Sequence, residues 1–322
     1  MIPFYAAIDW GTSRFRLWVL GEDGKILHEI STDEGLLNIG ALGFEAILEK
    51  HLNALGCPAD LSVVVCGMAG SRTGWQEAAY LDTPVDLAKI INNSVRVPHL
   101  TRDIRILPGL AQRDASMPDV MRGEETQLLG MLHRQIGQNN NGEQIICMPG
   151  THSKWVHIED QTVKGFTTFM SGELFSLISE HSILKNSITK REQIISEDPV
   201  FTSAVMAAIA KPEAITAQLF SIRSSQLLGF SDPSTAKAAL SGMIIGLELA
   251  GAKAKFGQLQ TVTLLASGNL GLLYKSALKC VDIETELDDA ESAGRVGLYH
   301  AAFLLWGQHK KTEMRKARQC QG

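Results

Sequence analysis

The chain has 322 residues, of which 45% are hydrophobic and 20% charged, and this length and composition favour a globular protein of two domains, or of one domain with a large elaboration. The formal net charge of −5 at pH 7 argues against nucleic acid or an anionic membrane as a partner. No apolar run is long enough to span a membrane, and the five scattered cysteines suit a reducing cytoplasm better than a disulfide framework or a zinc site.

The first third of the chain predicts a hairpin that enters an α/β domain. Alternating and continuous apolar runs predict strands over residues 5–9, 15–20, 26–32 and a buried parallel strand over 61–67. Helical spacing over residues 43–56 ends in a glycine, as helices often do. A helix is also predicted over residues 85–95, a short strand over 103–109 and a second helix over 123–137.

The second part of the chain repeats the opening pattern. The polar segment 138–144 has turn chemistry, so we place the boundary there, between an N-terminal domain of residues 1–136 and a C-terminal domain of residues 137–322. A strand, a turn and a returning strand follow over residues 144–159, as at the N-terminus. Residues 171–255 read as mostly helical, residues 261–280 as strand, Gly-rich turn and helix, and residues 293–307 as a final apolar helix that could pack back on the N-terminal domain.

Both hairpin turns have the chemistry of a phosphate site. Each carries a Gly-Thr pair, Gly11-Thr12 or Gly150-Thr151, followed by a polar residue or two and a cation. Glycine lets a ligand approach the backbone, and consecutive N–H groups form an anion-binding concavity. Both turns lead into strands, so neither is the P-loop that precedes a helix, and no GxGxxG supports a dinucleotide fold.

Carboxylates lie close to these turns in the sequence. Asp9 ends the first strand, where it could hold Mg²⁺ through water beside a phosphate, or could simply cap the turn. Glu124 and Glu125 begin a predicted helix. The helix dipole could simply stabilise carboxylates at this position, or the two side chains could act as a general base or metal ligand. The small residues at 266–271 could lie against a flat ring or could be a tight strand-to-helix turn.

Six segments together carry a family resemblance. They are "AIDWGTSRFRLW", "GMAGSRTGW", "VMRGEETQLLG", "MPGTHSKWV", "SGELF" and "SGMIIGLE". Paired hairpins with a late Gly-rich turn resemble the superfamily of sugar kinases, actin and heat-shock ATPases, and the six segments resemble the 2-dehydro-3-deoxygalactonokinase family from residue 6 to about residue 270. The resemblance implies two related actin-like ATPase (ribonuclease H-like) α/β domains with the active site in the cleft between them.

The resemblance also implies roles for individual residues. The two phosphate loops would be Asp9, Gly11, Thr12, Ser13 and Arg14, and Gly150, Thr151, His152, Ser153 and Lys154. Gly268 and Asn269 of the late turn would contact adenosine, and Ser71, Arg72, Trp75 and Glu173 would contact the sugar acid. The second loop has Met148-Pro149 where many members have an aspartate, which leaves Asp9 as the main magnesium-associated carboxylate.

The implied activity is phosphorylation of the 6-hydroxyl of 2-dehydro-3-deoxy-D-galactonate by ATP with Mg²⁺, in galactonate catabolism in the cytoplasm. "GEET" resembles a segment of exopolyphosphatases in which the second glutamate is catalytic, so Glu125 is the expected base and Glu124 the alternative. His152 is expected to be a structural hydrogen-bonding group. Two rival functions on the same fold are an exopolyphosphatase-like phosphohydrolase and a non-catalytic nucleotide-binding regulator. The sequence leaves the oligomeric state open, with a homodimer as one candidate.

Overall fold

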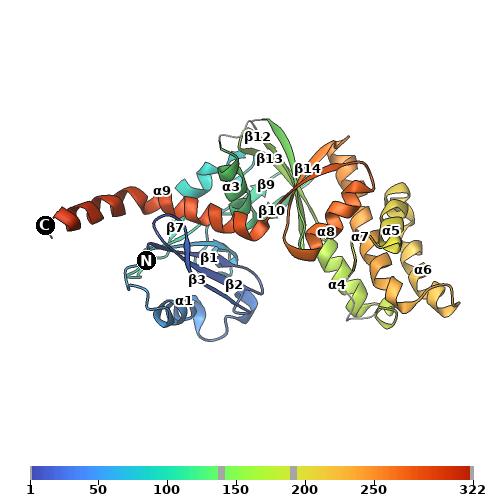
Figure 1. Cartoon of the computed structure of the whole chain (residues 1–322), viewed down its shortest axis with the longest axis horizontal. Helices are drawn as coiled ribbons and strands as arrows, with labels where there is room; N and C mark the ends of the chain where they lie inside the picture. Colours follow the sequence, from blue (N-terminus) through green and yellow to red (C-terminus); the bar gives the residue numbers. More distant parts are fainter. Residues whose placement is uncertain (1, 137–141, 189–193, 320–322) are drawn as a thin grey trace. The chain divides into compact units, whose positions relative to one another are not determined.

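A computed structural model describes residues 2–136, 142–188 and 194–319. The chain divides into two compact units, each with its own sheet (Figure 1). Unit 1 comprises residues 1–142, 159–165 and 291–322, and unit 2 comprises residues 143–158 and 166–290. The residues 137–141, which hold most of the predicted boundary segment, lie outside the described residues.

The main sheet of unit 1 has the strand order β3-β2-β1-β4-β8-β7. The apolar runs of the sequence form its centre, because β1 and β4 are parallel neighbours whose residues are almost all buried. β2 returns antiparallel to β1 and β3 antiparallel to β2, whereas β8 is parallel to β4. The strands are β1 (Tyr5–Trp10), β2 (Phe15–Leu20), β3 (Ile26–Thr32), β4 (Val63–Gly67), β7 (Val95–Arg96) and β8 (Ile104–Ile106).

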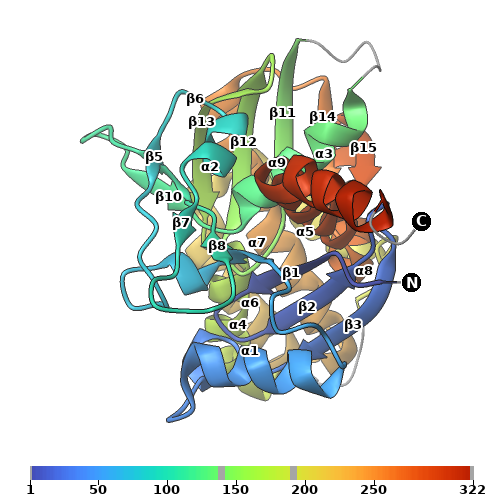
Figure 2. The same ribbon diagram turned by 90° about the vertical axis from the view of Figure 1, so that its left-hand side faces the viewer.

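Helices cover both faces of this sheet (Figures 1 and 2). Alternate residues of β1 point to opposite faces. Ile8 and Trp10 pack in one core with residues of α1 (Gly43–Ala54). Tyr5 points the other way and stacks on Trp306 of α9 (Ala290–Gln319), with 6.0 Å between ring centroids. Asp9 shares the parity of Tyr5, so the strand alternation directs it to the α9 side of the sheet.

The remaining elements of unit 1 are short, and the sequence pattern missed several of them. A three-stranded sheet has the order β10-β9-β5. The predicted helix over residues 85–95 was wrong at both ends, because residues 85–86 form β6, which pairs with the start of β13, and Val95 lies in β7. The elements are η1 (Leu36–Asn38), η2 (Met68–Gly70), β5 (Leu81–Asp82), β6 (Val85–Asp86), α2 (Ala88–Asn92), β9 (Leu110–Gln112), β10 (Asp119–Met121) and α3 (Glu124–Gln135).

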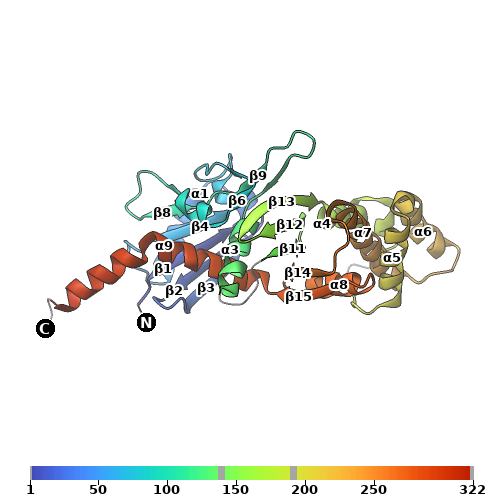
Figure 3. The ribbon, with the colours of Figure 1, turned by 90° about the horizontal axis from the view of Figure 1, so that it is seen from above.

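The sheet of unit 2 repeats the topology of unit 1 (Figure 3). Its order β13-β12-β11-β14-β15 matches β3-β2-β1-β4-β8, and β11, β14 and β15 are parallel as β1, β4 and β8 are. The strands are β11 (Glu143–Met148), β12 (Ser153–Glu159), β13 (Thr162–Phe169), β14 (Thr261–Leu265) and β15 (Glu284–Asp288). This shared order confirms the predicted fold class of two related actin-like ATPase domains.

A group of helices follows the sheet strands of unit 2, as the sequence predicted for residues 171–255. α5, α6 and α7 gather in one bundle (Figure 3). α5 and α7 approach closely because Gly242 and Gly246 have no side chain, and a Cβ there would lie 2.4 Å from the Phe201 carbonyl oxygen or 2.6 Å from that of Val205. The elements are α4 (Ser171–His181), η3 (Ile183–Asn186), α5 (Pro199–Ala210), η4 (Pro212–Ala214), α6 (Ile215–Leu227), α7 (Pro233–Phe256) and α8 (Gly268–Lys279).

No single helix in the described ranges is long and apolar enough to cross a bilayer. The pair Pro199–Ala210 and Pro212–Leu227, bent by 109°, meets the length and composition requirement only when its two members are taken together. Val205 and Ala208 of the first member are buried in the protein itself.

Candidate functional site

The turn between β1 and β2, residues 11–14, is held from behind by the segment at Gly35. The N–H groups of Leu36 and Leu37 donate to the carbonyl oxygens of Gly11 and Thr12, both at 3.0 Å. A Cβ on Gly35 would lie 2.3 Å from the carbonyl carbon of Ser13, so only glycine fits there. The side chains of residues 12–14 are exposed. Sequence reasoning missed this support, although the glycine after "STDE" was its one visible sign.

Asp9 is the last residue but one of β1, near that turn. Its Oδ2 accepts from Arg16 Nη1 at 3.2 Å, and its Oδ1 lies 3.9 Å from the Cys66 thiol, which donates to it. Burial raises the pKa of the Asp9 carboxyl, Arg16 opposes this, and the charge of Glu124 raises the pKa further. Burial is therefore the main cause of the raised pKa, and Asp9 has both a cation, Arg16, and a second carboxylate, Glu124, in its surroundings.

The start of α3 brings the two predicted glutamates to the same region of unit 1. Glu125 Oε2 accepts from the Gly123 N–H at 2.7 Å, and its Oε1 accepts from Thr126 Oγ1 at 3.1 Å. Glu124 Oε2 accepts from the Arg122 N–H at 3.0 Å and is more exposed than Glu125, which has no exposed surface. Burial and the neighbouring Glu124 charge raise the pKa of Glu125 from 4.5 to about 8.

This arrangement supports both roles that the sequence left open for Glu125. The bond to Gly123 is a helix-start interaction of the capping type. A carboxyl with a pKa near 8 is also tuned for general-base work at neutral pH. The position of α3 depends on α9, because a Cβ at Gly130 would lie 1.9 Å from the Ala293 carbonyl oxygen. The close helix crossing therefore holds Glu124 and Glu125 in place.

Three of the four predicted sugar-acid residues follow β4 in unit 1. Ser71 is buried, and its hydroxyl has no hydrogen-bond partner among the described residues. Arg72 is exposed. Trp75 is half-buried and stacks on Phe44 at 5.7 Å between ring centroids, so its ring anchors this loop to the α1 layer.

Arg122 is a neighbour of this loop that sequence reasoning did not single out. Its guanidinium lies 4.3 Å from the centroid of the Tyr80 ring and donates through Nη2 to the Ala78 carbonyl oxygen at 2.9 Å. Nη1 would lie 2.7 Å from a Cβ on Gly70. Nε and Nη1 have no hydrogen-bond partner within the part of the chain that the structure describes. Spare donors of both Arg122 and Ser71 therefore lie around this loop.

The second turn, between β11 and β12 in unit 2, is supported by the start of α4. The Glu173 N–H donates to the Thr151 carbonyl oxygen at 3.0 Å, and a Cβ on Gly172 would lie 2.4 Å from the Gly150 carbonyl oxygen. His152 Nε2 lies 2.6 Å from Glu173 Oε2. The structure thus places Glu173 beside the second turn, in contact with His152.

Two of the predicted phosphate ligands in this turn point inward. The Ser153 side chain is fully buried, and its Oγ lies 3.0 Å from the Tyr274 hydroxyl. Lys154 is 5% exposed. Thr151 and His152 are exposed at the tip of the turn. Contacts from this turn to an anion would therefore come from Thr151, His152 and the backbone more readily than from the Ser153 hydroxyl.

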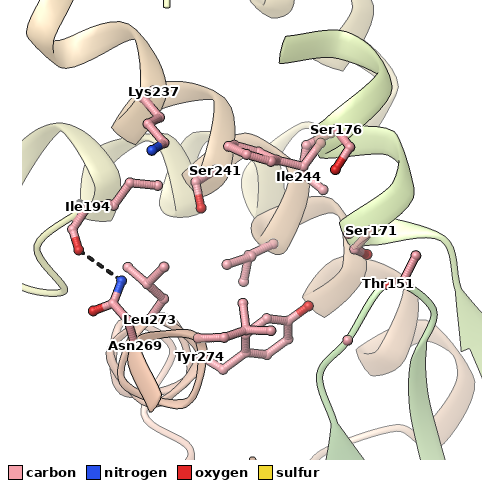
Figure 4. Close-up of a pocket in the computed structure, with 15 residues that line it drawn as sticks. Thr151, Ser171, Ser176, Ile194, Lys237, Ser241, Ile244, Asn269, Leu273 and Tyr274 are labelled. Atoms are coloured by element: carbon pink, nitrogen blue, oxygen red, sulfur yellow. Dashed lines mark hydrogen bonds between the residues drawn. The ribbon is translucent and has the colours of Figure 1, made fainter. Parts of the chain in front are cut away.

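A cavity of about 390 Å³ lies next to the second turn within unit 2 (Figure 4). Thr151 and Ser171 lie at one end of it and Lys237 at the other. Its walls are mostly apolar, with Asn269 among the polar groups; the Asn269 amide donates to the Ile194 carbonyl oxygen at 3.1 Å. Gly268 starts α8 with φ of 66°, a conformation that favours glycine. The lining residues beyond the second turn come from α4, α7, α8 and Ile194.

The carboxylates of unit 1 suit a hard cation that is shared with phosphate. Among the described residues, no group of three or more His, Cys, Asp or Glu side chains could hold a metal by itself. Asp9 and Glu124 are close enough for the Glu124 charge to raise the pKa of Asp9. Mg²⁺ typically uses one or two carboxylates and takes its other ligands from water and substrate phosphates. The donor set therefore fits Mg²⁺ only in the presence of phosphate.

Comparison with known proteins identifies the relatives of this chain. A family profile described as 2-keto-3-deoxy-galactonokinase matches residues 9–301. The chain is 48% identical over 303 residues to DgoK1 of Rhizobium meliloti (strain 1021), a probable 2-dehydro-3-deoxygalactonokinase, covering 94% of this chain and 98% of the relative. It is 31% identical over 305 residues to the 2-dehydro-3-deoxygalactonokinase of Escherichia coli (strain K12), covering 95% and 99%.

A solved structure agrees with the sequence relatives. The crystal structure of a proposed 2-dehydro-3-deoxygalactonokinase from Sinorhizobium meliloti is similar with a TM-score of 0.90 and 48% identity. The match covers 94% of this chain and 99% of that chain. The likeness therefore extends through both units.

Proposed function

The chain belongs to the 2-keto-3-deoxy-galactonokinase family, and we infer from this membership that it transfers the γ-phosphoryl group of ATP to the 6-hydroxyl of 2-dehydro-3-deoxy-D-galactonate. It is a phosphotransferase with an alcohol group as acceptor. The observation that carries the proposal is that Asp9, near a phosphate-type turn, lies close enough to Glu124 for the Glu124 charge to raise its pKa, within a chain related along almost its whole length to such kinases.

The nucleotide is assigned to unit 2. The cavity there begins at Gly150 and Thr151 and continues between apolar walls to Asn269 and Leu270, which suits a phosphate chain followed by a flat ring. α4 begins against the same turn, and backbone N–H groups at a helix start favour phosphate. Gly268 and Asn269 are therefore proposed as adenosine contacts, and the second turn as a phosphate loop.

Mg²⁺ and the first turn are proposed to neutralise the transferred phosphoryl group. Asp9 would hold the ion, directly or through water, and the ion would supply positive charge to the phosphate oxygens. The exposed turn residues Thr12, Ser13 and Arg14 would add hydroxyl, backbone and guanidinium donors. Phosphoryl transfer depends mainly on such positioning and charge stabilisation, because the protein forms no covalent bond.

Glu125 is proposed as the general base, with Glu124 as the alternative. The raised pKa of Glu125, about 8, supports the first assignment. The complete burial of Glu125 and the greater exposure of Glu124 support the second, because a base must reach the hydroxyl proton. The two assignments predict opposite results for single Glu-to-Gln variants.

The sugar acid is assigned to unit 1, at the loop that follows β4. Arg72 is proposed to bind the substrate carboxylate, since a guanidinium can pair with it through two N–H groups. The unpartnered Ser71 hydroxyl and the spare Arg122 donors are further groups for the substrate oxygens. Trp75 would act by holding this loop in place. Glu173 is a weaker candidate for a substrate contact, because its carboxylate already contacts His152.

A coupled ADP-release assay tests the proposal. Purified protein with ATP and Mg²⁺ would be given 2-dehydro-3-deoxy-D-galactonate, its C4 epimer, plain hexoses or no acceptor, and the product would be examined by phosphorus NMR. We expect ADP release only with the 2-keto-3-deoxy acids and a phosphate ester at C6. Loss of turnover when EDTA removes Mg²⁺ would support the magnesium assignment.

Two other outcomes would select other functions. Steady phosphate release without any acceptor, or from polyphosphate, would indicate a phosphohydrolase. ATP binding without turnover on any acceptor would indicate a nucleotide-binding regulator. We further propose a cytoplasmic enzyme of galactonate catabolism; a homodimer is the simplest assembly to examine by light scattering.

A further inference from the structure

α7 carries a buried acid next to the cavity of unit 2. Ser241, Ile244 and Ile245 line the cavity, and Glu248 follows three and four residues later on the same helix face. Glu248 is 1% exposed. It ends the "SGMIIGLE" segment, to which the proposed reaction gives no role.

Glu248 is hydrogen-bonded through both carboxylate oxygens. Trp155 Nε1 donates to Oε1 at 2.8 Å, and the Tyr274 hydroxyl donates to Oε2 at 2.7 Å. Because Tyr274 has one hydroxyl proton and donates it to Glu248, Ser153 Oγ is the donor in its 3.0 Å contact with Tyr274. The Ser171 side chain also hydrogen-bonds to Glu248, and Ser153 reaches Glu248 through Tyr274. One carboxylate therefore links four side chains.

These side chains belong to three parts of the proposed nucleotide site. Ser153 and Trp155 start β12, directly after the second phosphate turn. Ser171 starts α4, which supports that turn from behind. Tyr274 belongs to α8 and forms a wall of the cavity, and its hydroxyl points towards the end at which Thr151 and Ser171 lie (Figure 4). The network thus joins the turn, the helix start and the cavity wall.

The chemistry of burial explains why an acid occupies this position. Burial raises the pKa of Glu248, and its hydrogen bonds to Ser171, Tyr274 and Trp155 lower it. If the carboxylate were removed, the Trp155 indole and the Tyr274 hydroxyl would lose their acceptors in a place without water contact. A buried donor without an acceptor is costly, so these side chains would shift to find other partners. Their shift would move the turn and the cavity wall.

We propose that Glu248 is a positioning residue for the nucleotide, which holds the second phosphate turn, the start of α4 and the Tyr274 wall in their binding arrangement. This inference rests on the proposed assignment of ATP to unit 2. Glu248 does not contact the nucleotide and has no part in proton transfer. Its loss therefore weakens ATP binding while the affinity for the sugar acid, assigned to unit 1, stays unchanged.

The test measures ATP and sugar-acid affinity by calorimetry for wild type, E248M, E248Q, Y274F and L249M. Leu249 is the matched control, because it is also 1% exposed on α7 but packs in the apolar core. We expect E248M to weaken ATP binding on the order of tenfold. E248Q should be milder, since its amide oxygen can accept from Trp155 and its NH₂ can donate to the Tyr274 oxygen. Y274F should weaken ATP binding because it breaks the link to Ser153.

L249M should leave ATP affinity within about twofold of wild type even if it lowers the melting temperature. Wild-type ATP affinity in both E248Q and Y274F would overturn the inference, and so would equal losses of ATP and sugar-acid affinity in E248M. If E248M does not fold, E248Q and Y274F decide the question, because they change only one or two atoms. Absence of ATP binding by the wild-type protein would instead overturn the proposed function itself, and this inference with it.

Discussion

The two units share one strand order but differ in the surroundings of their acidic residues. In unit 1, Asp9 pairs with Arg16, and the charge of Glu124 raises the pKa of both Asp9 and Glu125. In unit 2, Glu248 is surrounded by donors, and its turn carries Met148-Pro149 where the first turn follows Asp9-Trp10. Closely spaced carboxylates mark the half proposed for chemistry, and one carboxylate surrounded by hydrogen-bond donors marks the half proposed for holding the nucleotide.

The largest expected effect is that of E125Q on turnover. The glutamine would keep the size of the side chain but could not accept a proton, so kcat should fall about 10²–10⁴-fold if Glu125 is the base. E124Q is the matched control, because its side chain lies one position away and is more exposed. Steady-state kinetics with both substrates saturating measure the effect. A large loss in E124Q with normal kcat in E125Q would transfer the role to Glu124.

The same variant has a pH signature in stability. The folded-state pKa of Glu125 is raised from 4.5 to about 8, so the native state holds a proton that the unfolded state has lost between these values. Stability therefore declines as pH rises through this interval. E125Q should reduce that decline in melting temperature. An unchanged pH slope in E125Q would mean that Glu125 titrates near its ordinary value.

D9N should come next, with a loss in kcat on the order of 10²-fold, because the carboxylate that positions Mg²⁺ is lost. The melting temperature should stay unchanged or rise, since a half-buried negative charge near Glu124 is removed. The exposed Asp23, in the turn before β3, supplies the control D23N, which should leave kcat at the wild-type level. Full activity of D9N would remove Asp9 from the site.

A smaller effect is expected from the glycines that support the two turns. G35A and G172A would each place a Cβ within 2.4 Å of turn backbone, and such overpacking typically costs about 1–3 kcal/mol of stability. We expect the KM for ATP to rise on the order of tenfold in both, as the loop amides move. G294A is the control, since its nearest neighbour is the flexible Gln127 side chain at 3.5 Å. An effect in only one variant would show that the two turns are not equivalent.

The smallest effect concerns the histidine pair of unit 1. The rings of His133 on α3 and His300 on α9 stack with 4.0 Å between centroids. Burial and the neighbouring His133 lower the pKa of His300 from 6.5 to about 4. As the pH falls, His300 is protonated in the unfolded state at a higher pH than in the folded state. Stability is therefore lost as pH falls from about 6.5 towards about 4.

H300F keeps a stacked ring without a titrating group. Thermal melts between pH 4 and 7 should therefore show a shallower loss of stability in H300F than in wild type, by a few degrees at the acid end. Parallel melting curves would contradict the assignment. This result would also place the acid sensitivity elsewhere than the α3–α9 contact.

Much of the architecture follows from local pattern. A continuous apolar run bounded by glycine predicted β4, because a strand buried on both faces needs apolar residues at every position, and shorter apolar runs predicted β1, β11 and β14. The two similar hairpins in the sequence predicted two related domains, and the two sheets share one strand order. The short strands β5, β6, β7 and β10 were missed, since two or three residues carry no readable period and are stabilised only by their partners.

The sequence by itself determined which residue types surround each turn and, through its resemblance, the family of the chain. Only the tertiary structure decided how those residues are used. It buried Glu125 and left Glu124 more exposed, turned Ser153 inward to Tyr274, set Glu173 against His152, and placed Gly35 and Gly172 behind the turns. These outcomes depend on contacts between segments far apart in the chain, and burial and pKa are properties of such contacts rather than of neighbouring letters.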